Sequence, residues 1–444
     1  MDSKESQRYL QEIITTGQEL CVGNIVERDL QIRVLPQKVS VCMGVRRCGK
    51  STLMQGMMQS LIEQGLPKEN LVHLNFMDER LPDLLQGEWN RIYEAYYGMY
   101  PHKRRAEKVV FLFDEMQDYP NWELFIERMR RDENCDIYLT GSSSRLLSHE
   151  IASCLRGRTL SWELFPFSYG EYLTRCGVSR KRARTTAERL KQQKAWVDYE
   201  QEGGFPEVYG LPVTERRNVL QEYFAYILYR DVVDRNKVQH PVALRHLSRR
   251  VINQVGALFS INKNLNEFKS LGISMTRAEM ENYLQWLEDA YFLISVPCAS
   301  ASLGEQQRRM KKLYCIDHAL AAACGLRFTE NAGSRLENIV AVALRRCSRD
   351  LYYYNTRNGH EVDFLVHLPD GRVHIVQVST DIAGTTTRNR EVRALTEAMA
   401  ELSLQHAYLI TQNHEEEIPT AQGTIHVVPA YLFLMGRDPL WVEP

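Results

Sequence analysis

The stretch Gly44-Val-Arg-Arg-Cys-Gly49-Lys50-Ser51 decides how the first part of the chain folds. It follows a short apolar run at residues 39–43 and precedes residues 52–58, whose composition suits a helix. A strand, a glycine-bounded loop, Lys-Ser and a helix together predict a phosphate-binding loop. The glycines let the backbone turn its N–H groups toward a phosphate, and the helix N-terminus adds partial positive charge. The alternative is a chance match in an ordinary strand–loop–helix, and the strand and helix context argues against it.

Within this loop, Lys50 is expected to reach the β- and γ-phosphates of a nucleotide, and the Ser51 hydroxyl to ligate Mg2+. The loop does not distinguish ATP from other nucleoside triphosphates, but the chain contains no N-K-x-D motif for reading guanine. The residues expected to contact the nucleotide are Gly44, Val45, Arg46, Arg47, Cys48, Gly49, Lys50, Ser51 and Thr52.

A second motif lies further along, where the apolar run 109–113 ends in Asp114 and Glu115. An apolar strand ending in Asp-Glu is the Walker B pattern, in which Asp114 holds Mg2+ through water and Glu115 is the general base for the attacking water. A strand that ends in a solvated acidic turn is the alternative. Residues 70–76 predict one strand between the two motifs, which favours the additional-strand P-loop ATPases over kinases and GTPases.

Three further residues are candidates for the reaction. Residues 136–140 predict a strand, and a polar residue at its tip can touch the γ-phosphate or the attacking water; Ser142 is the first choice and Thr140 the second. A serine-rich turn that caps the next helix is an equally good interpretation. Arg158 is a candidate arginine finger, in cis or from a neighbouring subunit of a homo-oligomer, against the alternative of a surface arginine.

Length and composition set the outer limits. A chain of 444 residues exceeds one core, so we expect about two to four domains. The formal net charge of -1 gives no global attraction to nucleic acid or acidic membranes. The first residues lack the apolar core of a signal peptide, and no apolar run approaches membrane-spanning length. The ten cysteines are scattered singly, without zinc spacing, which indicates a reduced cytoplasmic protein with no structural metal.

The motifs GVRRCGKS, FLFDE, LTGSSSRLL, RGRTLSWELFPFSYGEYL and GHEVDFLV together resemble one bacterial and archaeal family. These are AAA-type P-loop ATPases with a C-terminal DUF4143 region. The resemblance implies an α/β fold: a RecA-like parallel sheet with a helical lid, then a winged-helix module, then a domain similar to PD-(D/E)XK nucleases. It implies ATP and Mg2+ as cofactors and names no substrate. The expected domains are residues 1–172, 173–240, 241–320 and 321–444.

The middle of the chain holds two basic stretches that can contact DNA phosphates. The first stretch lies within residues 175–194. The second is the 306–312 segment, with Arg308 to Lys312 as the candidate contacts. For the first stretch, the favoured interpretation is a solvated helix of the lid. For the module around the second stretch, the favoured interpretation is packing against neighbouring parts of the chain or binding to a protein. In that module, helix, helix, helix, strand, strand is the winged-helix order; Leu258 is expected to line the first helix, and Thr276 to cap the third. The first stretch comprises Arg175, Arg180, Lys181, Arg182, Arg184, Arg189, Lys191 and Lys194, with Glu188 against them.

The last part predicts a helix, three strands, a helix and a final strand at 406–410, the order of a PD-(D/E)XK core. In an active nuclease of this kind a helix Glu and a strand Asp hold Mg2+, and Glu337 and Asp363 are in place. The E-x-K position reads Gln377-Val-Ser379, and no lysine follows Lys312, so no later lysine can substitute. His360 or His374 would need separate evidence as a replacement. We therefore expect a vestigial metal site.

These features predict a cytoplasmic Mg2+-dependent ATPase whose C-terminal modules bind DNA or a partner protein. Two alternatives belong to other classes. One is an ATP-gated nucleic-acid-binding regulator or nuclease that uses the PD-(D/E)XK-like domain. The other is a protein-interaction ATPase in which both C-terminal modules are docking surfaces. ATP turnover with and without DNA discriminates between them.

Overall fold

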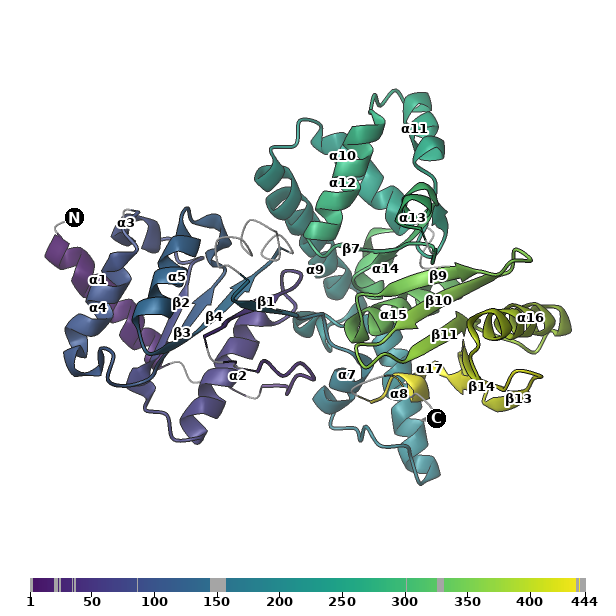
Figure 1. The fold of residues 1–444 in the computed structure, drawn as a ribbon, viewed down its shortest axis with the longest axis horizontal. Helices are drawn as coiled ribbons and strands as arrows, with labels where there is room; N and C mark the ends of the chain where they lie inside the picture. The colour runs from purple at the N-terminus through teal and green to yellow at the C-terminus, as the bar shows by residue number, and fades with distance from the viewer. Residues whose placement is uncertain are drawn as a thin grey trace. The chain divides into compact units, whose positions relative to one another are not determined.

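The structure is a computed structural model that describes residues 3–19, 23, 25–33, 35, 37–85, 87–143, 157–300, 302–325, 331–436 and 439. The chain divides into two compact units, Met1–Leu164 and Phe165–Pro444. Figure 1 shows the fold of each unit, with most of its helices and strands labelled. The end of the serine-rich turn, residues 144 and 145, and the Leu155-Arg156 pair before Gly157 lie outside the described residues.

The first unit is built on a five-stranded sheet in the order β2-β3-β4-β1-β5, in which every pairing is parallel. The central strands are almost entirely apolar because helices cover both faces of a parallel sheet. The strand β5 carries no such pattern, since its residues are half-buried at the sheet edge, and the sequence did not predict it. The strands are β1 (Val39–Met43), β2 (Leu71–Asn75), β3 (Val109–Asp114), β4 (Cys135–Gly141) and β5 (Thr159–Glu163).

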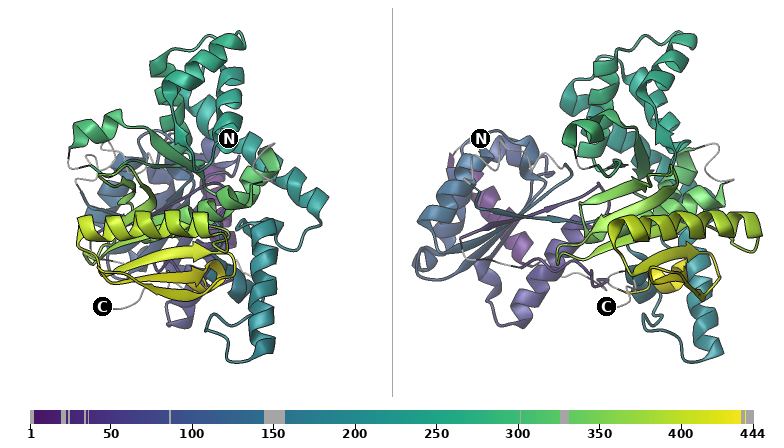
Figure 2. Two further views of the ribbon diagram at one scale, coloured as in Figure 1. Left: turned by 90° about the vertical axis from the view of Figure 1, so that its right-hand side faces the viewer. Right: turned by 45° about the vertical axis from the view of Figure 1, so that its right-hand side comes forward.

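Alternate residues of β3 separate the two faces of this sheet. Val110 and Leu112 pack with Met54 and Met58 of α2 on one face. Phe113 packs against Phe125 of α5 on the other face, at a ring-centroid distance of 6.2 Å. Figure 2 shows helices on both sides of the strands. The helices of this unit are α1 (Ser3–Gln18), α2 (Lys50–Glu63), α3 (Leu81–Leu85), α4 (Asn90–Met99) and α5 (Trp122–Asp132).

The second unit begins with a helical region whose first two helices have side-chain N-terminal caps. Ser168 and Glu171 form a capping box at α7, and Thr185 and Glu188 form another at α8. The region comprises α7 (Tyr169–Arg175), α8 (Thr186–Glu202), α9 (Val213–Tyr226) and a π-helical continuation of α9 (Ile227–Asp234).

A small module follows, with a three-stranded antiparallel sheet in the order β6-β8-β7. Thr276 caps α12 as predicted, since its hydroxyl accepts the Glu279 N–H at 3.2 Å. The placement of Leu258 on the first helix is wrong: that helix ends at Ile252, and Gly256, with φ +78°, turns the chain into strand β6. The elements are α10 (Pro241–Ile252), β6 (Leu258–Phe259), α11 (Ile261–Ser270), α12 (Arg277–Asp289), β7 (Leu293–Val296), α13 (Leu303–Arg308) and β8 (Lys311–Cys315).

The last region carries a six-stranded sheet in the order β13-β14-β12-β11-β10-β9. Strands β9 to β11 are antiparallel, while β11, β12 and β14 run parallel. The predicted final strand is β12, but two further strands follow it and extend the sheet. Helix α16 packs its apolar side on the sheet through residues such as Leu395 and Met399.

The elements of this region are α14 (His318–Cys324), α15 (Ala332–Cys347), β9 (Leu351–Asn355), β10 (Glu361–His367), β11 (Val373–Val378), α16 (Thr385–Leu402), β12 (His406–Thr411), β13 (Glu416–Pro419), β14 (Thr424–Pro429) and α17 (Ala430–Phe433). Of the helices that the structure describes, none is both long and apolar enough to cross a membrane.

Candidate functional site

The glycine-bounded loop connects β1 to α2 with the backbone that the motif requires. Gly49 caps α2 in the left-handed region, with φ 99°, and Lys50 is the first helical residue. At Gly44 a Cβ atom would lie 2.0 Å from the Leu164 carbonyl oxygen, so only glycine fits there. Because α2 begins directly at the loop, its free N–H groups and its dipole lie where an anion would bind.

Lys50 is buried in this loop, with 5% of its surface exposed. Its ammonium donates to the carbonyl oxygens of Gly44 at 3.0 Å and Val45 at 3.2 Å, and pairs with Glu115 Oε1 at 3.2 Å. Burial by itself disfavours the charged form, but the negative charge of Glu115 outweighs it together with smaller contributions, so the pKa of Lys50 lies above its usual value. The lysine is therefore held as a cation beside the Walker B carboxylates.

Glu115 follows β3 in the left-handed region, with φ 56°, and is 8% exposed. Its carboxylate faces Lys50 and lies 4.0 Å from Arg46 Nη1, while Gln117 Nε2 donates to Oε2 at 2.7 Å. Burial would raise its pKa, but Lys50 and Arg46 lower it to about 2. Glu115 is thus ionised, and the same contact that ionises it holds it to Lys50.

Thr140 links the two acidic residues of the Walker B motif. Its hydroxyl donates to Asp114 Oδ1 and accepts the backbone N–H of Glu115 at 3.1 Å. Ser142, the first choice from the sequence, is fully buried one residue beyond β4, whose last carbonyl, at Gly141, accepts the Gly44 N–H at 3.3 Å. Both residues therefore lie at the loop, but the contact with Asp114 belongs to Thr140. The register of β3 against β4 explains this contact: Phe113 pairs with Leu139, so the next residues on the two strands, Asp114 and Thr140, lie side by side.

Arg158 lies at the other end of the sheet. It precedes β5, its carbonyl accepts the N–H of Val39 at the start of β1, and its guanidinium pairs with Glu127 at 3.2 Å. Strands β1 and β5 run parallel for five residues each, which separates Arg158 from the phosphate loop by roughly 15 Å. The structure does not bring Arg158 to the loop of its own chain.

The residues at the loop fit a Mg2+–nucleotide. Ser51 and Thr52 are exposed in the first turn of α2, and Asp114 is 1% exposed with its carboxylate at the carboxyl end of β3. Mg2+ is bound by few protein oxygens and completes its coordination with phosphates and water. Ser51 and Asp114 are the oxygen donors that the site offers.

A second cluster of charged residues lies in the last region, and the structure brings Glu337 of α15 and Asp363 of β10 together there. Both contact the ammonium of Lys312 on β8, at 3.3 Å and 2.8 Å, and Glu361 contacts it at 2.9 Å. The sequence predicted that the lysine of this site was missing because no lysine follows residue 312. That prediction is wrong for the cation, which comes from Lys312 itself, on a strand that precedes α15 and β10 in the chain.

The remaining predicted members of this cluster do not form a metal site. Gln377 donates to Glu391 at 2.8 Å and accepts the Asp363 N–H at 3.0 Å. His360 lies elsewhere, against Glu397 at 2.7 Å, and burial lowers the pKa of His374 to about 4. Among the residues described, no group of three His, Cys, Asp or Glu side chains has the arrangement to hold a metal ion.

The chain matches three protein families along its length. Residues 36–173 match the family described as an AAA domain, residues 193–331 the Domain of unknown function DUF8612, and residues 332–433 the Domain of unknown function DUF4143. Uncharacterized protein MJ1544 of Methanocaldococcus jannaschii is 31% identical over 412 residues, which cover 91% of this chain and 89% of that protein. The chain belongs to this family of AAA-type P-loop ATPases with a C-terminal DUF4143 domain. The three matched ranges are called the AAA, DUF8612 and DUF4143 domains below.

Other proteins resemble this AAA-type family member less closely. An uncharacterized protein of Haemophilus influenzae is 28% identical over 352 residues, covering 78% of this chain and 84% of that protein. The Walker-type ATPase PABY2304 of Pyrococcus abyssi is 14% identical, with a TM-score of 0.40 and coverage of 73% and 95%. The Aeropyrum pernix ORC1 protein, solved in complex with DNA, is 13% identical, with a TM-score of 0.30 and coverage of 74% and 92%.

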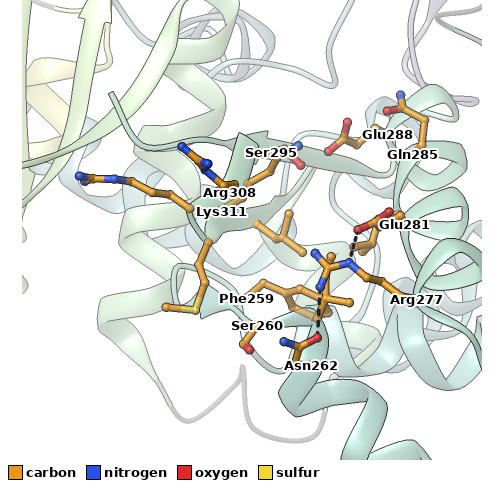
Figure 3. Close-up of a pocket in the computed structure, with 15 residues that line it drawn as sticks. Phe259, Ser260, Asn262, Arg277, Glu281, Gln285, Glu288, Ser295, Arg308 and Lys311 are labelled. Atoms are coloured by element: carbon orange, nitrogen blue, oxygen red, sulfur yellow. Dashed lines mark hydrogen bonds and ion pairs between the residues drawn. The ribbon is translucent and has the colours of Figure 1, made fainter. Parts of the chain in front are cut away.

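The DUF8612 domain contains a cavity of about 360 Å³ between α12 and the β7–β8 strands. Figure 3 shows Arg308 and Lys311 on one side of it, and Arg277 opposite, bonded to Glu281 and Asn262. Arg308 and Lys311 are exposed and make no ion pair with any residue that the structure describes. Lys312, expected from the sequence to contact phosphate with them, points away into the carboxylate cluster and is 3% exposed.

Three arginines of the first basic stretch contact other residues of the protein. Arg175 stacks on Tyr209, Arg180 donates to the carbonyl of Met435, and Arg182 pairs with Glu415 at 2.6 Å. The exposed remainder is Lys181, Arg184, Arg189, Lys191 and Lys194.

Proposed function

We propose that the protein binds ATP with Mg2+ and hydrolyses it at the loop between β1 and α2. The observation that carries the proposal is the group of Lys50, Glu115, Asp114 and Thr140, which comes from three segments: the start of α2, the end of β3 and the end of β4. Each residue has the chemistry that phosphoryl transfer needs: a cation for the phosphates, a carboxylate for the metal and a second carboxylate for the water.

In this proposal the loop amides and Lys50 bind the phosphates, and Ser51 and Asp114 hold the metal. Bound Mg2+ would neutralise charge on the phosphates. Glu115 takes a proton from the attacking water, and Thr140 fixes the position of Asp114 relative to Glu115. In the structure Lys50 holds the Glu115 carboxylate, so a phosphate that draws Lys50 away frees that carboxylate to act as a base.

ATP turnover tests this proposal directly. Purified full-length protein is assayed for phosphate release with ATP or GTP, with and without Mg2+, and compared with Lys50→Ala. We expect release with ATP that requires Mg2+ and is lost in the variant. Release that survives in Lys50→Ala, or its absence under every condition, contradicts the proposal.

We further propose four domains at residues 1–172, 173–240, 241–320 and 321–444, the third a winged-helix module and the fourth a PD-(D/E)XK-like fold. The helices and antiparallel strands of α10 to β8, and the α15-β9-β10-β11-α16-β12 order, support these two assignments. Both are output modules that bind DNA or a partner protein.

Binding to DNA phosphates is favoured by one observation, the cavity beside Arg308 and Lys311, two exposed cations that form no ion pair within 4.0 Å with a carboxylate that the structure describes. Fluorescence anisotropy with labelled duplex DNA at several salt concentrations tests it. We expect Arg308→Ala/Lys311→Ala to weaken binding and to lower the salt slope by about two. Arg189→Ala/Lys191→Ala on α8 is the matched variant for the other basic stretch. Unchanged binding in both double variants leaves a protein partner as the interpretation.

The alternative function, an ATP-gated nuclease, requires a metal at Glu337 and Asp363, and the contacts of Lys312 argue against one. We therefore expect no cleavage of plasmid, linear or single-stranded DNA in Mg2+ or Mn2+, with or without ATP. Cleavage that Asp363→Ala abolishes would make the nuclease the leading function.

A further inference from the structure

The carboxylates of the DUF4143 domain do not meet the requirements of the metal that the nuclease-like fold implies. We propose that the Lys312 ammonium is the resident cation of this cluster and stands in place of a divalent ion. The cluster then works as an electrostatic clasp between the DUF8612 and DUF4143 domains.

The ammonium is matched to its surroundings. A lysine carries three N–H donors, and three carboxylates surround Lys312, at 2.8 Å (Asp363), 2.9 Å (Glu361) and 3.3 Å (Glu337). Only 3% of Lys312 is exposed, so water cannot replace these contacts. The negative charges of Asp363, Glu337 and Glu361 outweigh the burial of Lys312 and hold its pKa above the usual value. The lysine therefore stays charged where it lies.

The carboxylates are also engaged on their other sides. Tyr314 donates its hydroxyl to Glu337 Oε1 at 2.7 Å, and Asp363 Oδ2 accepts the Val378 N–H at 3.0 Å. The backbone of Gly256 approaches Glu337 so closely that a Cβ there would lie 2.8 Å from Oε2. Mg2+ demands near-ideal octahedral coordination by oxygens at about 2.1 Å, and these oxygens already serve protein donors.

The amide at the third ligand position completes the arrangement. Gln377 bonds the Asp363 backbone through Oε1 and Glu391 through Nε2, at 3.0 and 2.8 Å. A carboxylate at this position could not donate to Glu391. The amide thus suits a cluster whose cation is an ammonium rather than a metal.

The clasp joins two regions that the sequence families separate. Lys312 and Tyr314 lie on β8 of the DUF8612 domain, while their carboxylate partners lie on α15 and β10 of the DUF4143 domain. Residues 165–444 accordingly form one compact unit.

Metal binding is tested on the full-length protein without nucleotide. Mn2+ titrations followed by electron paramagnetic resonance compare wild type with Asp363→Asn, which keeps the shape of the side chain and removes its charge. We expect the two titrations to coincide. A tight Mn2+ site in wild type that Asp363→Asn removes would overturn the proposal, whether or not the ATPase activity of the AAA domain is found.

The clasp itself is tested with neighbouring lysines on the same strand. Lys312→Met removes the buried charge, and Lys311→Met removes the exposed one beside it. Because buried Asp363 and the partly buried Glu337 and Glu361 lose their counter-ion, we expect Lys312→Met to lower the Tm by roughly 5–10 °C, while Lys311→Met changes it by about 1 °C or less. Equal Tm values for the two variants would overturn the clasp. If Lys312→Met does not fold, the Mn2+ comparison in the wild-type background still decides between ammonium and metal.

Discussion

The Lys50 ammonium lies 3.2 Å from Glu115 Oε1, so the proposed phosphate-binding cation and the proposed general base form a buried ion pair. While this ion pair is formed, Lys50 is not available to bind phosphate and Glu115 is not available to accept a proton from water. In the proposed mechanism a triphosphate would compete with Glu115 for Lys50, so that nucleotide binding and the release of the base would be one event. This coupling makes specific demands on variants of both residues.

Lys50→Ala should remove nucleotide binding, because the loop amides alone cannot offset the triphosphate charge. Titration with a fluorescent ATP analogue measures the affinity. Lys38→Ala is the control, since Lys38 is half-buried and its ammonium donates to the Gly157 carbonyl at 2.7 Å, at the end of β1 away from the loop. Unchanged affinity in Lys50→Ala would mean that this loop is not the phosphate site.

Glu115→Gln should keep nucleotide binding and lose turnover by on the order of a hundredfold or more, because the amide cannot accept the proton of water. The variant also releases Lys50 from its ion pair, so its ATP affinity should equal or exceed that of wild type. Phosphate release and ATP titration on the same preparation measure the two effects. Normal turnover would show that another group activates the water.

Thr140→Val should slow turnover by roughly tenfold or more, because it keeps the side-chain shape and removes the hydroxyl that links Asp114 to Glu115. Ser142→Ala is the comparison, since Ser142 is the neighbouring buried hydroxyl at the end of the same strand. A larger loss in Ser142→Ala than in Thr140→Val would reverse the assignment. Phosphate release at saturating ATP separates the two variants.

The phosphate loop and the Walker B residues could be predicted because each is local in the sequence. Gly49, which adopts φ 99°, and the apolar strand followed by two carboxylates can each be recognised from a short stretch of sequence, without knowing which distant residues they contact. The choice between Thr140 and Ser142 depended instead on the register of β4 against β3, which sets the residue that faces Asp114. Sequence spacing alone could not supply that register.

Lys312 shows a second limit. Its partners Glu337 and Asp363 lie 25 and 51 residues away, and nothing in the strand β8 marks Lys312 rather than Lys311 as the buried member of the pair. The strand β5 was missed for a different reason: it is an edge strand with half-buried polar residues and has no apolar run. In both cases the deciding information is tertiary.

Arg158→Ala should leave turnover within about twofold of wild type in dilute protein, since Arg158 pairs with Glu127 at the end of the sheet away from the phosphate loop. The measurement is phosphate release over a range of protein concentrations. A loss of tenfold or more would require a neighbouring subunit to supply Arg158 in trans. Mixing Arg158→Ala with Glu115→Gln would then restore activity, because each subunit supplies what the other lacks.

Glu288, which lines the cavity beside Lys311, should make stability depend on pH. Burial raises its pKa to about 7; Asp289 adds to this, while Lys311 and Arg345 oppose it. Between its unfolded pKa near 4.3 and about 7 the folded state binds the extra proton, so the free energy of unfolding falls as pH rises through this window and is flat above it.

Glu288→Gln removes this titration and keeps the side-chain volume. Its Tm should therefore exceed that of wild type at pH 8, where the half-buried carboxylate is charged, and the difference should shrink toward pH 5, where wild type is protonated. Glu281→Gln is the matched control, because Glu281 lines the same cavity but is exposed and paired with Arg277 at 2.8 Å. Thermal unfolding of the three proteins at pH 5, 6, 7 and 8 measures the effect. A Tm difference for Glu288→Gln that does not vary with pH would show that this carboxyl keeps an ordinary pKa in the folded protein.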